Sequence, residues 1–273
     1  EDDTGRLWTG LANHYVGLGM FDKARDMFEE GISKVMKVRD FALVWDAYAE
    51  FEEGLLQTLL ESRDTDASTF QLQTARFESV LDRRPFMISS VLLRQNPNNV
   101  NEWLRRINMY REKKDWRSVA RTFKQAIKTV DPSRCKGKLS SLHAGYAQFY
   151  EHHGEIEKAR RIFTRALDVS YANVDELASI YCARVEMEIC NLTPKIGLDI
   201  LRQICVVPPA HLRDLRGLPV HDRIYRSTKL WCLYADLEES IGTPEGVRAA
   251  YDGMLDLKIA TPRVVLCYAA YLE

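Results

Sequence analysis

The sequence lacks the short cysteine, glycine and histidine motifs that mark most metal sites and common active sites. Its six cysteines stand at least eight residues apart, which excludes the C-x-x-C spacing of zinc and redox sites and predicts reduced thiols. The signatures G-x-x-x-x-G-K-[ST], H-E-x-x-H and G-x-S-x-G are also missing, and with them the minimal parts of a P-loop, a zinc protease and an α/β-hydrolase. We therefore expect no enzymatic activity, no metal and no cofactor.

Long apolar runs are scarce as well. No stretch approaches the ~18 consecutive apolar residues that a membrane-spanning helix requires, and no charged-then-apolar leader opens the chain. We expect an intracellular protein without a membrane partner. Hydrophobic residues nevertheless make up 46% of the 273 residues, enough for a large core. Because the chain begins with Glu1 rather than Met and Glu273 cuts off an apolar helical pattern, we expect a piece of a longer protein.

Charge is balanced over the whole chain but not along it. Lys and Arg number 38 against 39 Asp and Glu, yet residues 1–70 carry a net charge of −8 and residues 101–138 a net charge of +8. Such a division favours charged partners. The alternative is that solvated helix faces simply differ in sign by chance.

An aromatic pattern repeats along the sequence. The segment from Trp45 to Glu52 begins with an aromatic residue and has Tyr, Ala, Phe and Glu at positions +3, +4, +6 and +7. Full or partial copies start at positions 8, 103, 143, 179, 231 and 266, and a small residue, usually alanine, recurs at +4. Four of the six intervals are 35 to 40 residues long, and the other two contain insertions.

A second pattern begins sixteen residues after each of four starts. Ala24, Val119, Ala159 and Val247 each open apolar positions spaced 0, +4, +7 and +8. Both patterns follow one face of an α-helix, and Gly19, Gly154 and Gly242 supply turns between them. The sequence therefore predicts an all-α fold, a right-handed α-solenoid of helix-turn-helix hairpins starting near residues 6, 43, 101, 141, 177, 229 and 264 in a single array over 1–273.

Repeat stacking explains most of the aromatic residues. We assign these to the repeat core: Trp8, Trp45, Trp103, Tyr146, Trp231, Phe28, Phe123, Phe163 and Tyr251. Positions +7 and +17 should face each other across a hairpin, which predicts an ion pair between Glu238 and Arg248. In the units starting at Trp8 and His143, position +7 is a tyrosine, so Arg25 and Arg160 should lie near the rings of Tyr15 and Tyr150.

These patterns resemble the half-a-TPR (HAT) repeat, a family largely confined to RNA-processing proteins. Five shorter stretches resemble the Syf-type HAT-repeat pre-mRNA splicing factors, the XPA-binding protein type: residues 38–41, 83–85, 90–97, 236–240 and 259–262. The resemblance runs from about residue 6 to the end. It departs from the repeat after Trp45, where an insertion displaces the second helix, and at Gly197-Leu198, which replace the usual Ala-Arg.

The resemblance implies a nuclear scaffold for protein-protein contacts in the spliceosome. Its implied partners are other spliceosomal proteins, namely NineTeen-complex and HAT-repeat scaffold proteins and an intron-binding helicase, with RNA secondary.

Two insertions fall outside the repeat pattern. Residues 54–72 are acidic and polar, and we expect a mobile loop there. Residues 206–227 contain three prolines and four arginines and are either an ordered loop packed beside its own repeats or a phosphate-binding segment. The alternative function is therefore direct RNA binding through the band 105–138 and the arginines of 211–226. The candidate contacts are Arg213, Arg216, Arg223, Arg226, Arg105, Arg106, Lys113 and Lys114.

Overall fold

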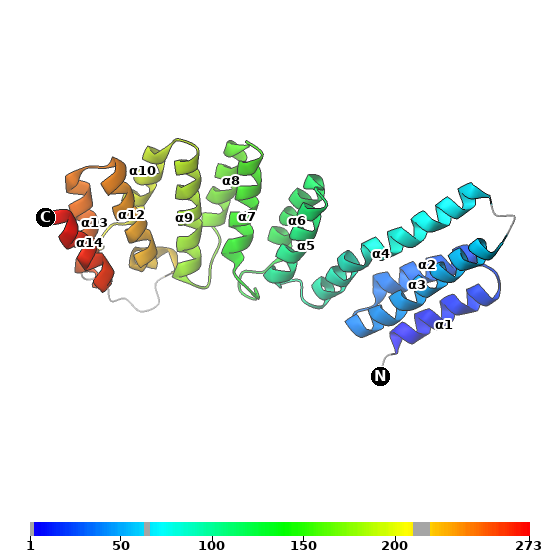
Figure 1. Ribbon diagram of the computed structural model, residues 1–273. Coiled ribbons are helices and arrows are strands. Elements are labelled where there is room, and N and C mark those ends of the chain that lie inside the picture. Colours follow the sequence, from blue (N-terminus) through cyan, green and yellow to red (C-terminus); the bar gives the residue numbers. More distant parts are fainter. Residues whose placement is uncertain (1–2, 63–65, 210–218) are drawn as a thin grey trace. The chain divides into compact units, whose positions relative to one another are not determined.

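The computed structural model describes residues 3–62, 66–209 and 219–273, and almost all of them lie in helices or short turns between them (Figure 1). The chain divides into two compact units, residues 1–115 and 116–273. The first unit contains α1 (Thr4–Gly17), α2 (Phe21–Lys34), α3 (Val38–Glu61), α4 (Ala67–Gln95) and α5 (Val100–Glu112).

The second unit continues the same pattern of short antiparallel helices. It contains α6 (Trp116–Thr129), α7 (Leu139–His152), α8 (Ile156–Leu167), α9 (Val174–Cys190), α10 (Pro194–Ile204), the 3-10 helix η1 (His221–Arg226), α12 (Thr228–Ile241), α13 (Pro244–Asp256) and α14 (Pro262–Leu272). The predicted all-α class is confirmed. The single continuous array and its right-handed sense stay predictions.

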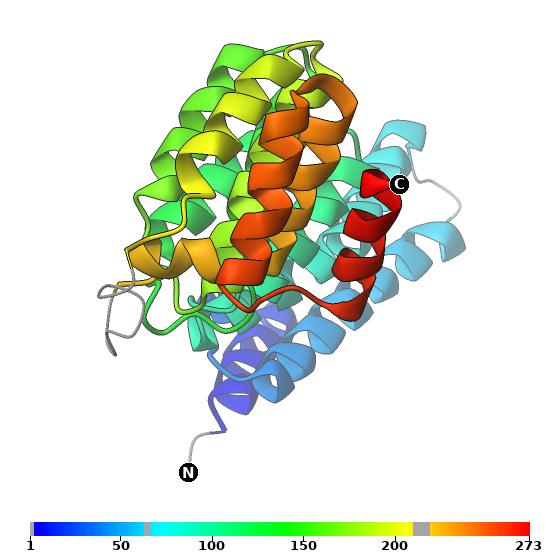
Figure 2. The same ribbon diagram turned by 90° about the vertical axis from the view of Figure 1, so that its left-hand side faces the viewer.

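Helices pack first within a hairpin and then against the next hairpin. The hairpin partners in contact are α1 with α2, α3 with α4, α7 with α8, α9 with α10 and α12 with α13. First helices of successive hairpins are also in contact, α1 with α3 in the first unit, and α7 with α9 and α9 with α12 in the second (Figures 1 and 2). The second helix of a hairpin also contacts the first helix of the next hairpin, as α2 contacts α3, α8 contacts α9 and α10 contacts α12. These are the neighbour contacts of stacked helical repeats.

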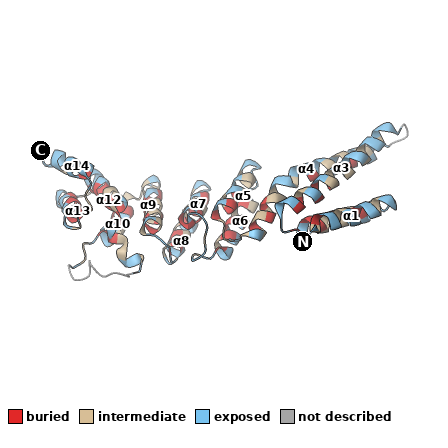
Figure 3. Cartoon of the chain, turned by 90° about the horizontal axis from the view of Figure 1, so that it is seen from below, coloured by how far each residue is buried: buried red, intermediate tan, exposed pale blue. Residues whose placement is uncertain are grey.

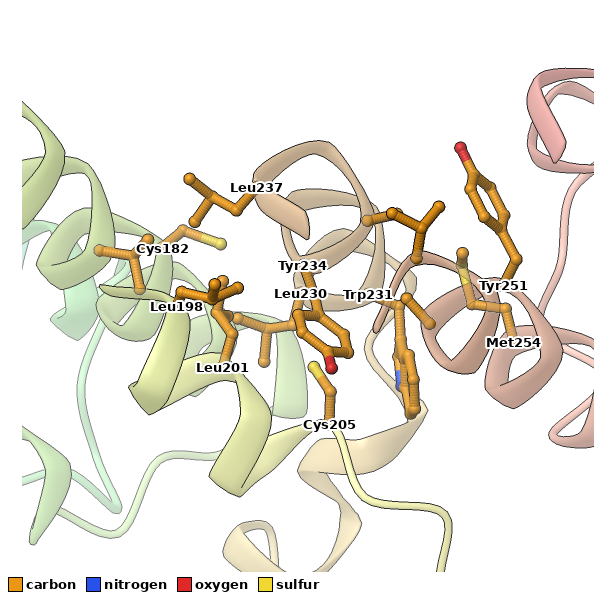
Figure 4. Packing of buried hydrophobic residues seen from close by; sticks show 14 of the residues in the cluster. Cys182, Leu198, Leu201, Cys205, Leu230, Trp231, Tyr234, Leu237, Tyr251 and Met254 are labelled. Carbon is orange, nitrogen blue, oxygen red and sulfur yellow. The ribbon is translucent and has the colours of Figure 1, made fainter. Parts of the chain in front are cut away.

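Each helix buries one side and exposes the other (Figure 3). In the second unit one buried cluster draws on helices α9, α10, α12, α13 and α14, and Figure 4 shows side chains of α10, α12 and α13 meeting there. Trp231 is 1% exposed, and its indole Nε1 donates a 2.7 Å hydrogen bond to the backbone carbonyl of Tyr225. The indole N–H of Trp231 therefore has its hydrogen-bond partner within the fold.

Seven of the nine predicted core aromatics are buried, namely Trp45, Trp103, Trp231, Phe28, Phe123, Phe163 and Tyr251. Trp8 and Tyr146 are half-buried. The Trp8 indole nevertheless lies against α2, where a Cβ on Gly31 would come within 2.9 Å of the Trp8 Cβ. Tyr146 stacks on Phe123 with ring centroids 5.2 Å apart.

The insertion at 54–72 is largely helical, which corrects the expected loop. Residues 54–61 extend α3 and residues 67–72 open α4. These two helices are 24 and 29 residues long, far longer than the other described α-helices, which have 11 to 17 residues. The added residues therefore lengthen a hairpin.

Four hairpin turns share one backbone feature eleven residues after the first aromatic position. Gly19 and Gly154 adopt φ values of 72° and 75° there, which glycine tolerates because it has no Cβ. Lys114 and Leu192 adopt the same left-handed conformation, with φ values of 55° and 59°. Counting back eleven residues from Leu192 places the start of its repeat at Tyr181, two residues later than expected.

Candidate interaction surfaces

A buried glutamate joins successive hairpins at three places. Glu52 of α3, Glu188 of α9 and Glu238 of α12 are each 1% exposed. An arginine from the second helix of the preceding hairpin forms a two-pronged contact with each carboxylate. Its Nε lies 2.7 Å from Oε1 for Arg25–Glu52, 2.8 Å for Arg160–Glu188 and 2.7 Å for Arg202–Glu238. Planar guanidinium and carboxylate groups match in this geometry, so each pair fixes the docking of two repeats.

Each carboxylate also accepts a hydrogen bond from the second helix of its own hairpin or from the residue that caps that helix. Gln73 of α4 donates to Glu52 Oε2 at 2.6 Å, and the Thr193 hydroxyl donates to Glu188 Oε2 at 2.6 Å. At Glu238 the donor is the backbone N–H of Thr243, at 3.2 Å. One buried side chain thereby links three helices.

The expected ion pair between Glu238 and Arg248 is wrong, because Arg202 takes both oxygens of Glu238. In the units starting at Trp8 and His143, the arginine at position +17 binds a glutamate of the next hairpin rather than a residue of its own. Arg25 and Arg160 therefore bind carboxylates.

Lysines take the place expected for the arginines beside the tyrosine rings. Lys23 Nζ lies 5.9 Å from the centre of the Tyr15 ring, and Lys158 Nζ lies 5.6 Å from that of Tyr150.

The third junction explains the departure from the repeat at Gly197-Leu198. With the repeat starting at Tyr181, position +17 is Leu198, which cannot pair with a carboxylate. Arg202 stands four residues later on the same face of α10 and reaches Glu238 from one turn further along. The sequence stretch Tyr181 to Glu188 carries the signal for this register, since it ends in the same Glu at +7 as Trp45 to Glu52.

The candidate contacts in the first unit are partly engaged by their own unit. Arg106 donates to the Ser90 hydroxyl at 2.8 Å, and Arg105 lies 3.8 Å from Glu102. Lys113 lies 3.9 Å from Asp82, with its Nζ 5.1 Å from the centre of the Phe86 ring. Lys114 occupies the left-handed turn position already described.

The arginine-rich insertion is described only in part. Arg213 and Arg216 lie outside the described residues. Arg223 and Arg226 belong to η1, which packs on α9. Arg223 is half-buried, whereas Arg226 is exposed with its guanidinium carbon 5.7 Å from the centre of the Tyr225 ring. The described end of the insertion thus packs beside its own repeats.

The elongated α3–α4 hairpin forms an open groove with the turn between α1 and α2. This groove encloses about 640 Å³, and Phe21, Leu55 and Leu59 are among the residues that line it. Phe21 is 41% exposed and Met20 beside it is 44% exposed. Arg25 and Arg76 add charge to the lining.

Neither a metal centre nor a bilayer-spanning helix is found in the described ranges. No three His, Cys, Asp or Glu side chains in these ranges gather closely enough to bind a metal ion. None of the helices formed by these residues combines the length and apolar character needed to cross a membrane.

Comparison with known proteins agrees with this architecture. Residues 1–130 match the family model of the middle HAT repeat of pre-mRNA-splicing factor SYF1, and residues 132–273 match that of the Syf1/CRNKL1 C-terminal HAT repeat. The chain belongs to the SYF1-type family of HAT-repeat pre-mRNA splicing factors. The Syf-type resemblance seen in the sequence is thus confirmed.

Individual SYF1-type proteins match over the whole of this chain. Pre-mRNA-splicing factor SYF1 of Homo sapiens is 41% identical, SYF1 of Dictyostelium discoideum 37% and cwf3 of Schizosaccharomyces pombe 39%. Each alignment covers 100% of this chain and 32%, 33% and 35% of the respective relative. The chain therefore spans about a third of the length of these SYF1-type relatives.

Proposed function

We propose that this chain is a non-catalytic scaffold segment that holds spliceosomal proteins together during pre-mRNA splicing in the nucleus. The observation that carries this proposal is the series of three buried Arg–Glu junctions. They lock neighbouring hairpins in fixed register and leave the outer helix faces available to partners. These relatives are pre-mRNA-splicing factors, which points to splicing as the process.

The surface chemistry favours protein partners over a small-molecule substrate. Open grooves lined by exposed apolar side chains and rimmed by arginine suit protein interfaces, where a few such anchors dominate the binding energy. The α1–α4 groove has this composition, with Phe21 and Met20 exposed beside Arg25. The partners that fit this role are NineTeen-complex and HAT-repeat scaffold proteins and an intron-binding helicase.

Crosslinking mass spectrometry on the native assembly tests the scaffold role. The full-length protein is epitope-tagged in cells, purified with its partners and treated with a lysine-reactive crosslinker. We expect crosslinks from exposed lysines of this segment, such as Lys23 and Lys195, to other splicing proteins. A segment that crosslinks to no protein partner while the assembly remains intact would contradict the proposal.

Matched variants make this experiment sharper. Phe21→Ala should reduce the crosslinks of Lys23 in the first unit and leave those of Lys195 in the second unit unchanged. Leu192→Ala is the control, because Leu192 is a 91% exposed apolar side chain in a turn of the second unit. It should leave the crosslinks of Lys23 unchanged.

A further inference from the structure

One helix of the second unit presents a cationic face with no counterpart in α2, α8 or α13. Four basic residues of α6 are exposed, Arg117, Arg121, Lys124 and Lys128. At 100° per residue they fall within an arc of about 60°, on the side opposite the buried residues Val119, Phe123 and Ala126. The stripe they form is about 17 Å long, from 11 steps of 1.5 Å.

Nothing within the described residues neutralises this stripe. Residues 116–129 contain no Asp or Glu, and none of the four cations lies within 4.0 Å of a carboxylate oxygen of a described residue. Three more exposed basic residues follow in the loop after α6, Arg134, Lys136 and Lys138. The stripe therefore has a positive field that is available to a ligand.

The repeat fold itself does not require these cations. The repeat spacing that aligns Val119 with Ala24, Ala159 and Val247 identifies the equivalent residues of three other second helices. They are Asp22, Asp26, Glu29 and Ser33 in α2, then Glu157, Arg161, Thr164 and Asp168 in α8, and Glu245, Ala249, Asp252 and Asp256 in α13. Acidic or neutral residues occupy eleven of these twelve positions, and Arg161 is the one basic residue among them. Hairpins of the same architecture thus form without a cationic stripe, so the α6 stripe serves something other than folding.

An exposed tryptophan lies at one end of the stripe. Trp116 begins α6, is 45% exposed, and meets the His153 ring edge to face at a centroid distance of 5.3 Å and an interplanar angle of 71°. The indole is thereby held against the C-terminal end of α7 while nearly half its surface stays open. At 100° per residue Trp116 lies about 100° round the helix from Arg117, between the cationic and the buried faces, and one residue before the stripe begins. An exposed aromatic ring next to a run of cations is an arrangement with which proteins bind single-stranded nucleic acid.

We propose that α6 is a single-stranded RNA binding face, on which the four cations bind successive phosphates and Trp116 stacks with a base. RNA fits this surface better than an acidic protein segment does. Protein interfaces depend on buried apolar or aromatic anchors, and the outward face of α6 between Arg117 and Lys128 offers cations and Gln125 instead. Phosphate binding needs no such anchor, because counterion release supplies the free energy.

The test measures binding of the 273-residue chain to a labelled oligouridine strand of about 15 nucleotides, within the site sizes of single-strand binders, by fluorescence anisotropy. Four phosphate contacts on a single strand predict that the affinity falls about 50-fold between about 50 mM and about 200 mM salt. A variant with Arg117→Ala, Arg121→Ala, Lys124→Ala and Lys128→Ala should bind at least roughly tenfold more weakly at the lower salt concentration and lose most of this salt dependence.

A matched control removes the same charge elsewhere. Lys37→Ala, Arg39→Ala, Lys195→Ala and Lys229→Ala change four exposed cations outside α6 and should leave binding within about twofold of the parent chain. Circular dichroism and thermal unfolding of both variants establish that the helices are intact. An equal loss of affinity in the two variants would overturn the site, because the binding would then depend on net charge alone.

Trp116→Ala separates the base contact from the phosphate contacts. It should weaken binding several-fold at both salt concentrations without changing the salt slope, since stacking releases no counterion. A polyglutamate peptide of similar length is the competing ligand. If this peptide bound the parent chain as tightly as the RNA, and lost its affinity in the α6 variant, the RNA assignment would be overturned in favour of an acidic protein partner.

Discussion

Three glutamates that are almost fully buried each pair with an arginine of the preceding hairpin. At Glu188, hydrogen bonds from the Arg160 guanidinium lower the pKa of the carboxyl, and they outweigh burial, which acts in the opposite direction. At Glu238 burial raises the pKa, but the hydrogen bonds from Arg202 and the Thr243 N–H prevail and the pKa is lowered. Both carboxylates therefore stabilise the fold at neutral pH and lose this contribution as pH falls through the lowered pKa.

Glu188→Gln should destabilise the protein by about 1.5–3 kcal/mol, the range for a hydrogen bond to a charged group. The amide cannot accept both prongs of Arg160, and its N–H₂ group faces donors in a site that is closed to water. Chemical denaturation at neutral pH measures the loss.

Arg160 supplies its own control for this substitution. It also binds Glu157, at 2.7 Å, but that side chain is 74% exposed. Because exposed ion pairs contribute little, Glu157→Gln should cost less than about 1 kcal/mol. Equal losses for the two variants would show that burial does not determine the strength of the junction.

His143 makes stability depend on pH in a different range. It is 4% exposed at the position that holds tryptophan in other repeats, and burial lowers the pKa of its imidazole to about 4. The unfolded chain binds a proton near pH 6.5 and the folded chain does not, so the stability falls as pH decreases between these values. The loss from pH 7 to pH 5 is about 2 kcal/mol.

His143→Phe should remove this loss, because phenylalanine does not titrate. The measurement is the free energy of unfolding at pH 7 and at pH 5 for the parent chain and the variant. Comparing the two pH values in each protein cancels any packing change that the new ring causes. The same pH dependence in both proteins would show that another group is responsible.

The sequence predicted the individual helices better than any other feature of the structure. Apolar spacing predicted both helices of the hairpins starting at Trp8, His143 and Trp231, because a helix that buries one face must repeat its apolar residues at 3.6-residue intervals. The 54–72 insertion was wrongly expected to be a loop. Its residues are polar because the lengthened helices expose them, and polarity alone does not distinguish an exposed helix from a loop.

Contacts between hairpins were much harder to predict than the hairpins. The repeat spacing showed the Glu at +7. It did not show whether the arginine that binds this Glu comes from the same hairpin or from the preceding one, because that depends on how the repeats stack. In the third junction the arginine is Arg202, four residues after the expected position. It can replace an arginine there because residues four apart lie on the same face of a helix. For the same reason, the sequence showed a basic band but not which of its cations share a helix face.

The turn between α9 and α10 contains a residue that strains the backbone. Leu192 has a φ of 59° and is 91% exposed, so its side chain gains little from packing while its Cβ is crowded in the left-handed conformation. Leu192→Gly should therefore stabilise the protein by up to about 1 kcal/mol, despite the greater freedom of glycine in the unfolded chain. Thermal unfolding measures the gain.

The equivalent turn of the previous hairpin supplies the reverse substitution. Gly154 has a φ of 75°, and a Cβ added there would meet nothing within 4 Å, so only the backbone conformation is tested. Gly154→Leu should destabilise the protein by about 1–2 kcal/mol. A gain in stability for this variant would contradict the assignment of strain to these turns.

At the scale of the whole molecule, stability should be distributed as it is in stacked repeats, where each hairpin depends on its immediate neighbours. A defect in α13 should then spread to adjoining helices and no further. Gly246 offers such a defect, because a Cβ there would lie 2.4 Å from Oε2 of Glu238. The carboxylate would have to move, and with it the contact from Arg202 that holds α10 to α12.

Hydrogen exchange on Gly246→Ala tests this expectation helix by helix. We expect faster amide exchange in α10, α12 and α13 and unchanged exchange in α1 to α3 of the first unit. Gly54→Ala is the matched control, since a Cβ on Gly54 of α3 meets nothing within 4 Å and alanine favours a helix over glycine by up to about 1 kcal/mol. If Gly246→Ala accelerated exchange in α1 to α3 as much as in α12 and α13, the chain would unfold as one cooperative body, and the nearest-neighbour description of its stability would be wrong.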